Sequence, residues 1–327
     1  MNGEQPRIEI FAPFGVAFEW MKTVLFRPFD FVKWLTIAFA AFLAGSWGGS
    51  FNPGRFGRIF SGDFKYHAKT YGDVPTDWQF PNWAIGLVIA GVVFAIILAF
   101  VFMWIAARGR FIYSDCVVRN RGAIVEPWRE YRREGNSFFL FSLAVTAIIV
   151  AITLILVLAI VVPMGLFSHN NRAETGLGIT LVLALIVLGL IWLVFMLFFA
   201  LISQFMVPVM YRRRCAAREA FVDVAKLILN NPGPFILFVL FGIVLGIAVA
   251  VVGTLAACLT CCIGALPYVS AVLLLPAFVW LMSFKLLFLR QFGDQYDVWA
   301  TTGFPQQPVV PPTEPPPAAP LPPPATA

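Results

Sequence analysis

Three cysteines near the end of a long apolar run, Cys258, Cys261 and Cys262, have a spacing that can support chemistry. On a helix, Cys258 lies on the same face as the other two, so a thiol pair facing an oxidising compartment would form a redox site. A structural zinc ion needs four ligands, and no His, Asp or Glu lies nearby in the sequence. The alternative is that these small side chains only pack at the outer end of a helix, and the apolar setting favours it.

Other reactive groups are sparse. His67 and His169 have no carboxylate partner at metal-ligand spacing, so we expect surface residues. The sequence contains no phosphate-binding glycine loop, no HExxH and no nucleophile elbow. Proton-coupled transporters, pumps and intramembrane proteases normally need ionisable groups deep in the membrane. Lys285 does not meet this need, because it lies close enough to the end of its apolar run for its ammonium group to reach the interface. The sequence therefore predicts a protein that is not an enzyme and needs no metal or cofactor.

Arginine is the most concentrated polar side chain. The stretch Ala107–Asn136 holds seven arginines and four acids, and a second basic segment, Tyr211–Pro234, begins Tyr-Arg-Arg-Arg. A basic residue near an anionic leaflet contributes about 1 kcal/mol of attraction, so these arginines are candidate contacts for anionic lipid headgroups. The candidates are Arg108, Arg110, Arg119, Arg121, Arg129, Arg132, Arg133, Arg212, Arg213 and Arg214. Alternatively they only set topology, with Glu126, Glu130 and Glu134 pairing locally.

Long apolar segments separate the basic stretches and determine where the arginines lie. The chain has 327 residues, of which 60% are hydrophobic and 12% charged, whereas soluble domains carry about 25% charged residues. About 20 apolar residues cross the hydrocarbon core as a helix, so the sequence predicts an all-α membrane protein with six transmembrane helices arranged as three hairpins. The expected spans are residues 31–49, 83–106, 137–167, 176–206, 235–257 and 269–289.

A cytoplasmic amphipathic or basic segment precedes each expected hairpin. Within Pro13–Phe29 and Ala216–Leu229, apolar residues recur at helical spacing and charged residues occupy the other face. We expect both helices to lie in the membrane interface. A further short interfacial helix is expected near Phe56–Lys65, in the outer connection on the opposite side of the membrane. The unit of surface helix, span, outer turn and span thus occurs three times, which fits either an ancient triplication or the ordinary alternation of a six-span protein.

Charge placement predicts orientation and boundaries. Most Lys and Arg residues fall in the amino-terminal, second and fourth connecting segments and the carboxyl-terminal end, and positive residues resist translocation. We therefore expect both termini in the cytoplasm of a bacterium and the spans in its inner membrane. The predicted divisions are residues 1–30 with the interfacial helix, 31–290 as the six-span domain, and 291–327 as a Pro-rich disordered cytoplasmic tail.

Three runs carry a family resemblance: AFEWMKTVLFRPFDFVKWL at Ala17–Leu35, PWREYRREGNSFFLF at Pro127–Phe141 and AREAFVDVAKLILNNPGPFILF at Ala217–Phe238. They resemble the starts of the hairpins in bacterial six-span proteins grouped with YciC and with the membrane domain of some glycerophosphodiester phosphodiesterases. The resemblance implies the six-span topology and supplies no catalytic residue.

Two functions from different classes fit these features. The first is a non-enzymatic protein that organises membrane, or binds anionic lipid or a protein partner, through its basic cytoplasmic face. The Pro-rich tail, with PxxP-like stretches at Pro308–Pro311 and Pro317–Pro320, is a candidate contact for a protein partner. The sequence has no basic face with interleaved aromatic residues, so we expect no nucleic-acid partner.

The second function is a transporter or lipid facilitator with a cavity between the hairpins and kinks at Pro163, Pro208 and Pro276. The polar residues expected to line that cavity are Ser142, Thr146, Thr153, Ser203, Gln204 and Thr254. A ridge of small residues, Gly242, Gly246 and Ala250, predicts close helix packing either within the molecule or between copies.

Overall fold

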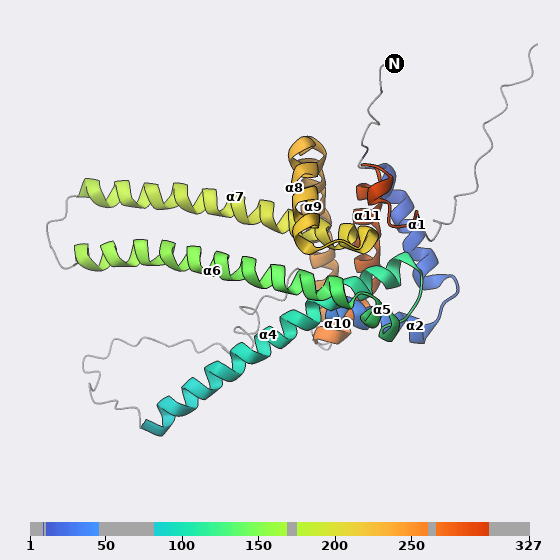
Figure 1. The fold of residues 1–327 in the computed structure, drawn as a ribbon, viewed down its shortest axis with the longest axis horizontal. Helices are drawn as coiled ribbons and strands as arrows, with labels where there is room; N and C mark the ends of the chain where they lie inside the picture. Colours follow the sequence, from blue (N-terminus) through green and yellow to red (C-terminus); the bar gives the residue numbers. More distant parts are fainter. Residues whose placement is uncertain (1–8, 10, 46–81, 169–174, 261–265, 301–327) are drawn as a thin grey trace, which may run out of the picture.

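The structure is a computed structural model that describes residues 9, 11–45, 82–168, 175–260 and 266–300. Within these ranges every regular element is a helix (Figure 1). The elements are α1 (Ala12–Phe26), α2 (Phe31–Leu43), α4 (Asn82–Val118), α5 (Val125–Glu130), α6 (Arg132–Ser168), α7 (Thr175–Arg213), α8 (Ala217–Asn230), α9 (Pro232–Leu259), α10 (Pro267–Leu273), α11 (Leu275–Arg290) and the 3-10 turn η2 (Asp294–Tyr296). The expected outer helix near Phe56–Lys65, both histidines and the Pro-rich tail beyond residue 300 lie outside the described residues.

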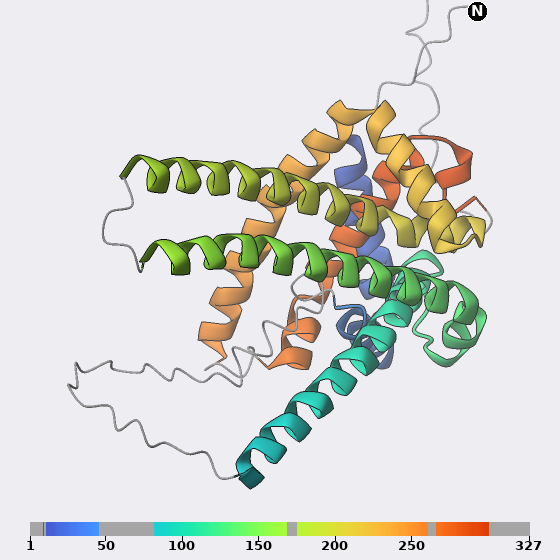
Figure 2. The same ribbon diagram turned by 60° about the vertical axis from the view of Figure 1, so that its left-hand side comes forward.

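Four helices are long and apolar enough to cross a membrane, with spanning portions at Gly86–Val118, Arg132–Leu158, Ile186–Arg213 and Pro232–Ala256. Their apolar side chains are largely exposed, as expected where lipid is the solvent. Helices α6 and α7 extend side by side, whereas α4 leaves in a different direction (Figures 1 and 2). The chain is therefore a helical membrane protein.

The first and last of the six expected spans look different from the other four. Helix α2 has 13 residues, or about 20 Å at 1.5 Å per residue, against a hydrocarbon thickness of about 30 Å. The last expected span is divided into α10 and α11, with 7 and 16 residues. Residues 46–49, the end of the first expected span, lie outside the described residues. Six crossings with both termini inside stay a prediction.

The buried core lies at one end of the long helices, and we call this region the hub. There α1, α2, α8 and α11 meet the ends of α4, α6 and α7 (Figure 2). Its largest fully buried side chains come from five different elements or segments: Ile37, Phe111, Phe205, Phe288 and Trp299. The hub is thus a protein core from which apolar helices project.

Helix α1 packs its apolar face along α11. Ala17, Met21 and Val24 are buried there, and the indole N–H of Trp20 donates to the carbonyl of Val117 at 3.1 Å. The predicted helix is present, but protein covers most of its apolar face. Helical periodicity identifies an amphipathic face without telling whether lipid or protein covers it. Phe18 is exposed on the same helix.

Helix α8 behaves in the same way. Ala220, Val224 and Ile228 are buried where α8 packs against α7 and α6. The backbone N–H of Ala217 donates to the Ser137 hydroxyl oxygen at 3.0 Å, which satisfies one of the free amides of its first turn. For both α1 and α8, location in the membrane interface stays a prediction.

The stretch Ala107–Asn136, which the predicted spans leave as a connecting segment, is largely helical. Helix α4 continues to Val118, α5 occupies Val125–Glu130, and α6 begins at Arg132. Gly109 lets α4 pack closely against α2, because a Cβ there would lie 2.7 Å from the backbone carbonyl carbon of Leu43 in α2. Five of the seven arginines in this stretch therefore extend from helices, and Arg119 and Arg121 extend from the short connection between α4 and α5.

Candidate functional site

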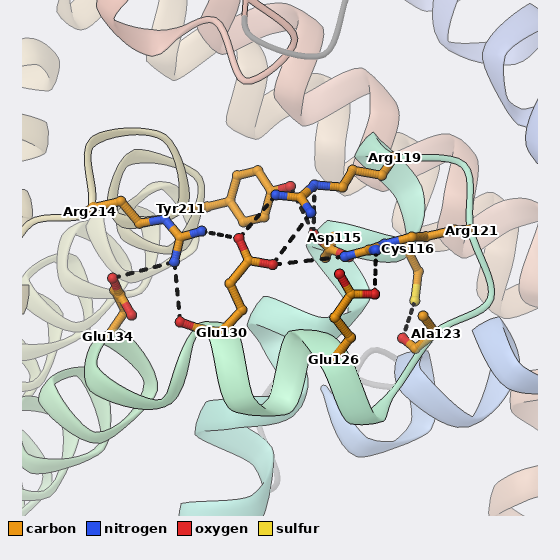
Figure 3. Close-up of polar contacts among 10 residues, drawn as sticks. All are labelled: Asp115, Cys116, Arg119, Arg121, Ala123, Glu126, Glu130, Glu134, Tyr211 and Arg214. Atoms are coloured by element: carbon orange, nitrogen blue, oxygen red, sulfur yellow. Dashed lines mark hydrogen bonds and ion pairs between the residues drawn. The ribbon is translucent and has the colours of Figure 1, made fainter.

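An ion-pair network joins the end of α4 to α5 and α7 (Figure 3). The carboxylate of Asp115 is fully buried and accepts hydrogen bonds from the Tyr211 hydroxyl at 3.1 Å and from Arg121 Nε at 2.9 Å. Arg119 pairs with Asp115 at 3.2 Å and with Glu130 at 3.0 Å. A buried carboxylate is costly unless it is paired, and here several donors meet that need.

The same network extends to α7 through Arg214. Its guanidinium contacts Glu130, lies 3.6 Å from Glu134, and stacks 3.9 Å from the ring centroid of Tyr131. Outside the network, Arg213 contacts Asp223 of α8. Four of the predicted lipid contacts, Arg119, Arg121, Arg213 and Arg214, are thus engaged by acids of the same chain.

Electrostatics in the network favour the charged forms. Burial acts to raise the pKa of Glu130, but the positive charges of Arg119 and Arg214 outweigh it and lower the pKa below its ordinary value. Burial likewise acts to lower the pKa of Arg121, and its bonds to Glu126 and Asp115 raise it instead. The network is therefore a set of stable ion pairs rather than a source of exchangeable protons.

Arg108 has a different environment, made of aromatic rings and an amide. Its guanidinium lies 4.4 Å from the ring centroid of Trp104 and 5.0 Å from that of Trp128. Arg108 Nη2 donates to Asn136 Oδ1 at 2.8 Å, and the Trp104 indole N–H donates to the same oxygen at 3.2 Å. Gly135 makes room for this side chain, because a Cβ there would lie 2.9 Å from Arg108 Cγ.

These residues form a pocket of about 400 Å³, which we call the Arg/Trp pocket. It is lined by Trp104, Arg108, Trp128, Arg129 and Arg132. Arg129 and Arg132 are exposed, and among the described residues neither forms an ion pair. Guanidinium groups bind phosphate and carboxylate in a bidentate manner, so the lining is suited to an anion.

Sequence reasoning found the arginines of this pocket and missed its aromatic walls and Asn136. One local signal was present, because Trp104 and Arg108 are four residues apart and so share a helix face. The approach of Trp128 and Asn136 depends on how α5 and α6 fold back on α4, which no local pattern encodes.

The other predicted arginines occupy three settings. Arg110 is partly buried, with its guanidinium 5.3 Å from the ring centroid of Phe138. Arg133 is exposed and Arg212 is partly buried, and neither is ion-paired within the described part of the chain.

The small-residue ridge on α9 does not meet another described helix at its glycines. A Cβ added at Gly242 or Gly246 would find no atom within 4 Å, and Ala250 is exposed. Among the described residues, no neighbouring helix therefore packs closely at Gly242 or Gly246. Helix α9 instead packs at its hub end, where Phe235 meets Phe205 of α7 edge-on. Its Phe238 ring stacks on Phe284 and Phe288 of α11. Contact between copies stays a prediction.

The cysteine cluster is described only in part. Cys258 is exposed in the last turn of α9, and Cys261 and Cys262 lie outside the described residues, so the redox pair stays a prediction. Elsewhere, Cys116 is buried and its thiol donates to the Ala123 carbonyl, and burial raises the pKa of Cys215. In the described ranges, no group of three or more His, Cys, Asp and Glu side chains could hold a metal ion.

The residues expected to line a transport cavity do not converge. Thr146, Thr153, Gln204 and Thr254 are exposed, and Ser142 and Ser203 are partly buried. The hydroxyls of Thr153 and Thr254 donate to carbonyls one turn earlier in their own helices, which is how an isolated hydroxyl is satisfied in an apolar helix. Pro208 lies inside α7, and the α10–α11 junction at Leu274 falls just before Pro276. A kink at Pro163 stays a prediction.

Fold and pocket together define the class: a helical membrane protein whose basic side chains gather around a buried hub. Within that class the chain belongs to a family of unknown function, DUF7544, which matches residues 10–298. No curated protein and no solved structure matches it. The resemblance to the YciC group stays a prediction.

Proposed function

We propose that this protein is a non-enzymatic component of the cytoplasmic membrane that binds anionic phospholipid headgroups in the Arg/Trp pocket and thereby organises the surrounding membrane. The observation that carries the proposal is the pocket itself. Three guanidinium groups and two indoles surround about 400 Å³, and no acid lines it. Its basic residues are therefore not neutralised by their lining neighbours, unlike those of the ion-pair network.

The position of the pocket favours a lipid over a soluble anion. Trp104 follows the apolar part of α4, and Ile97, Phe100 and Val101, one and two turns earlier on that side, are exposed. If the phosphate group of a lipid bound in the pocket, the acyl chains of that lipid would lie along this exposed apolar surface. Tryptophan and arginine are also the side chains that anchor helices at the headgroup level.

Two arginines of the pocket have the mobility that headgroup binding needs. Arg108 is only 6% exposed and is held by Asn136 and two rings, so it supplies a fixed charge. Arg129 and Arg132 are exposed at the rim and can close on a bound phosphate. This arrangement supports the charge-based prediction that the hub faces the cytoplasm, where anionic headgroups attract basic side chains.

The proposal is tested by substituting the two rim arginines together. We expect Arg129→Gln with Arg132→Gln to weaken binding of phosphatidylglycerol to the detergent-solubilised full chain by roughly thirtyfold, since each basic residue contributes about 1 kcal/mol. Binding is measured by titrating short-chain phosphatidylglycerol against the purified protein, with phosphatidylcholine as the neutral lipid.

The matched control is Arg133→Gln with Arg218→Gln, which removes two exposed arginines that do not line the pocket. We expect its affinity to stay within about threefold of the unsubstituted chain, because exposed charges outside the pocket add only a screened attraction. Equal losses in both double variants would show that only the overall charge matters. That result would contradict a specific pocket.

A further inference from the structure

The Arg/Trp pocket lies where two membrane helices diverge. Trp104 and Arg108 of α4 line it together with Arg132 of α6. Asn136 of α6 accepts the hydrogen bond from Arg108 that joins the two helices at this point. Away from the hub the helices separate, because α6 continues beside α7 while α4 takes another direction (Figures 1 and 2). A lipid headgroup held in the pocket is therefore next to two diverging helices.

Both helices present exposed apolar side chains beyond the pocket. On α4, Phe100 is exposed one turn before Trp104. On α6, Leu140 and Leu154 are 62% and 57% exposed. At 3.6 residues per turn, both lie within about 40° of Asn136 around the helix. Each helix thus offers its own apolar surface to acyl chains that leave the pocket.

The pocket gathers three positive charges that the chain does not pair. Arg108, Arg129 and Arg132 come from three different helices, α4, α5 and α6. None of the ion pairs in the described ranges includes any of them. A lipid with one phosphate diester brings one negative charge, so two of the three guanidinium groups keep no counter-charge. A second anionic group would relieve the repulsion among them.

The pocket also has room for more than one phosphate group. Its volume is about 400 Å³. That is the space of about thirteen water molecules at about 30 Å³ each, and one phosphate group fills only a fraction of it. The polar groups of the lining side chains are guanidinium and indole N–H groups, which can only donate hydrogen bonds. Such a lining is satisfied best by the acceptor oxygens of phosphates.

We infer that the preferred ligand of the Arg/Trp pocket is a lipid whose headgroup holds two phosphate diesters, each with its own pair of acyl chains. This inference rests on the proposed function and names the class of lipid. Arg108 supplies a fixed charge for one phosphate, and the rim arginines Arg129 and Arg132 close on the other. One pair of acyl chains lies along α4 and the other along α6. Bisphosphatidylglycerol has this chemistry.

The test compares bisphosphatidylglycerol with phosphatidylglycerol. Short-chain forms of both lipids are titrated separately against the full chain purified in a neutral detergent. We expect the unsubstituted chain to bind the two-phosphate lipid roughly tenfold more tightly, because the second phosphate meets guanidinium groups that phosphatidylglycerol leaves unpaired. Having two equivalent phosphates would by itself give a factor of only about two.

The rim arginines decide whether this preference comes from the pocket. In Arg129→Gln with Arg132→Gln, the preference should fall to about twofold, because only Arg108 remains and the second phosphate has no partner. The matched control, Arg133→Gln with Arg218→Gln, removes two exposed arginines outside the pocket and should keep the roughly tenfold preference. The same control accounts for the larger apolar part of the two-phosphate lipid, since that part is unchanged.

Phosphatidic acid separates the number of charges from the number of phosphates. Its single phosphate monoester carries about 1.5 to 2 negative charges at pH 7. We expect short-chain phosphatidic acid to bind less tightly than bisphosphatidylglycerol, because one phosphate cannot meet both Arg108 and the rim. Equal binding of these two lipids would overturn the inference.

Two further results would overturn the inference and leave the proposed function standing. The first is an unsubstituted chain that binds bisphosphatidylglycerol and phosphatidylglycerol within about twofold of each other, while the rim variant still loses phosphatidylglycerol. The second is a rim variant that keeps the full preference, which would assign it to the acyl chains. If the unsubstituted chain bound neither lipid, the proposed function would fail together with the inference.

Discussion

Two groups of arginines from the same stretch of sequence have opposite surroundings. Arg119 and Arg121, just after α4, are ion-paired with the buried Asp115. Arg129 and Arg132, which lie ten and eleven residues after Arg119 and Arg121, line a pocket with indole walls and no acid. The difference teaches that arginine density does not define a binding surface. What decides the role of each arginine is which side chains the fold brings within its reach.

The contrast has a simple physical cause. A carboxylate buried as completely as that of Asp115 must be paired, so the nearest guanidinium groups are used within the protein. Around Arg108 the neighbours are Trp104, Trp128 and Asn136, which hold the guanidinium without neutralising it. One group of arginines therefore holds helices together, and the other is available to an external anion.

The largest expected effect comes from breaking the network at its centre. Asp115→Asn should lower the free energy of unfolding by about 3 kcal/mol or more, because it leaves Arg119 and Arg121 without their buried partner. The effect is measured by denaturant unfolding of the detergent-solubilised chain. Asp223→Asn is the control: its pair with Arg213 is partly exposed, so the loss should stay below about 1 kcal/mol. Similar losses in both variants would contradict a special role for the network.

A smaller effect is expected from crowding the pocket without removing a charge. Gly135→Ala places a methyl group 2.9 Å from Arg108 Cγ, so the guanidinium must shift from its position between the rings. We expect phosphatidylglycerol affinity to fall by about threefold, a fraction of the 1 kcal/mol that one basic contact supplies. Gly91→Ala in α4, where the new methyl group meets no atom within 4 Å, should leave the affinity unchanged. A tighter-binding Gly135→Ala protein would be evidence against the pocket geometry.

The smallest effect concerns pH. Because the folded protein holds the pKa of Glu130 below its ordinary value of 4.5, Glu130 favours folding at neutral pH. This contribution is present above the ordinary pKa and is lost as the pH falls through the lowered one. Unfolding measured from about pH 6 down to about pH 3 should therefore show a shallower loss of stability for Glu130→Gln than for the unsubstituted chain. An unchanged slope would mean that Arg119 and Arg214 do not stabilise this carboxylate.

The long helices could be predicted from the sequence because hydrophobic length is a local property. The uncharged runs within α4, α6, α7 and α9 were identified in this way, and helical periodicity also indicated α1 and α8. What covers the apolar faces could not be predicted, since the burial of Val24 against α11 and of Val224 near α7 depends on contacts between distant segments.

The candidate site was predictable only as a list of charged residues. The pairing of Arg214 with Glu130 spans 84 positions, and the bond between Tyr211 and Asp115 spans 96, so no spacing rule separates these arginines from those of the pocket. The expected span ended at residue 106 because the charges of Ala107–Val118 favour exposure. In the structure, Asp115 and Arg108 are buried and α4 continues past both.

The most direct test of the lipid proposal is photocrosslinking with a phosphatidylglycerol analogue that carries a diazirine near its headgroup. The protein is reconstituted in vesicles, irradiated, digested and mapped by mass spectrometry, with a phosphatidylcholine analogue as the reference. We predict crosslinks concentrated on α4 between Ile97 and Trp104 and on α5, and lost in the Arg129→Gln, Arg132→Gln protein. Crosslinks spread evenly over α4, α6, α7 and α9, with no difference between the two lipids, would contradict the account.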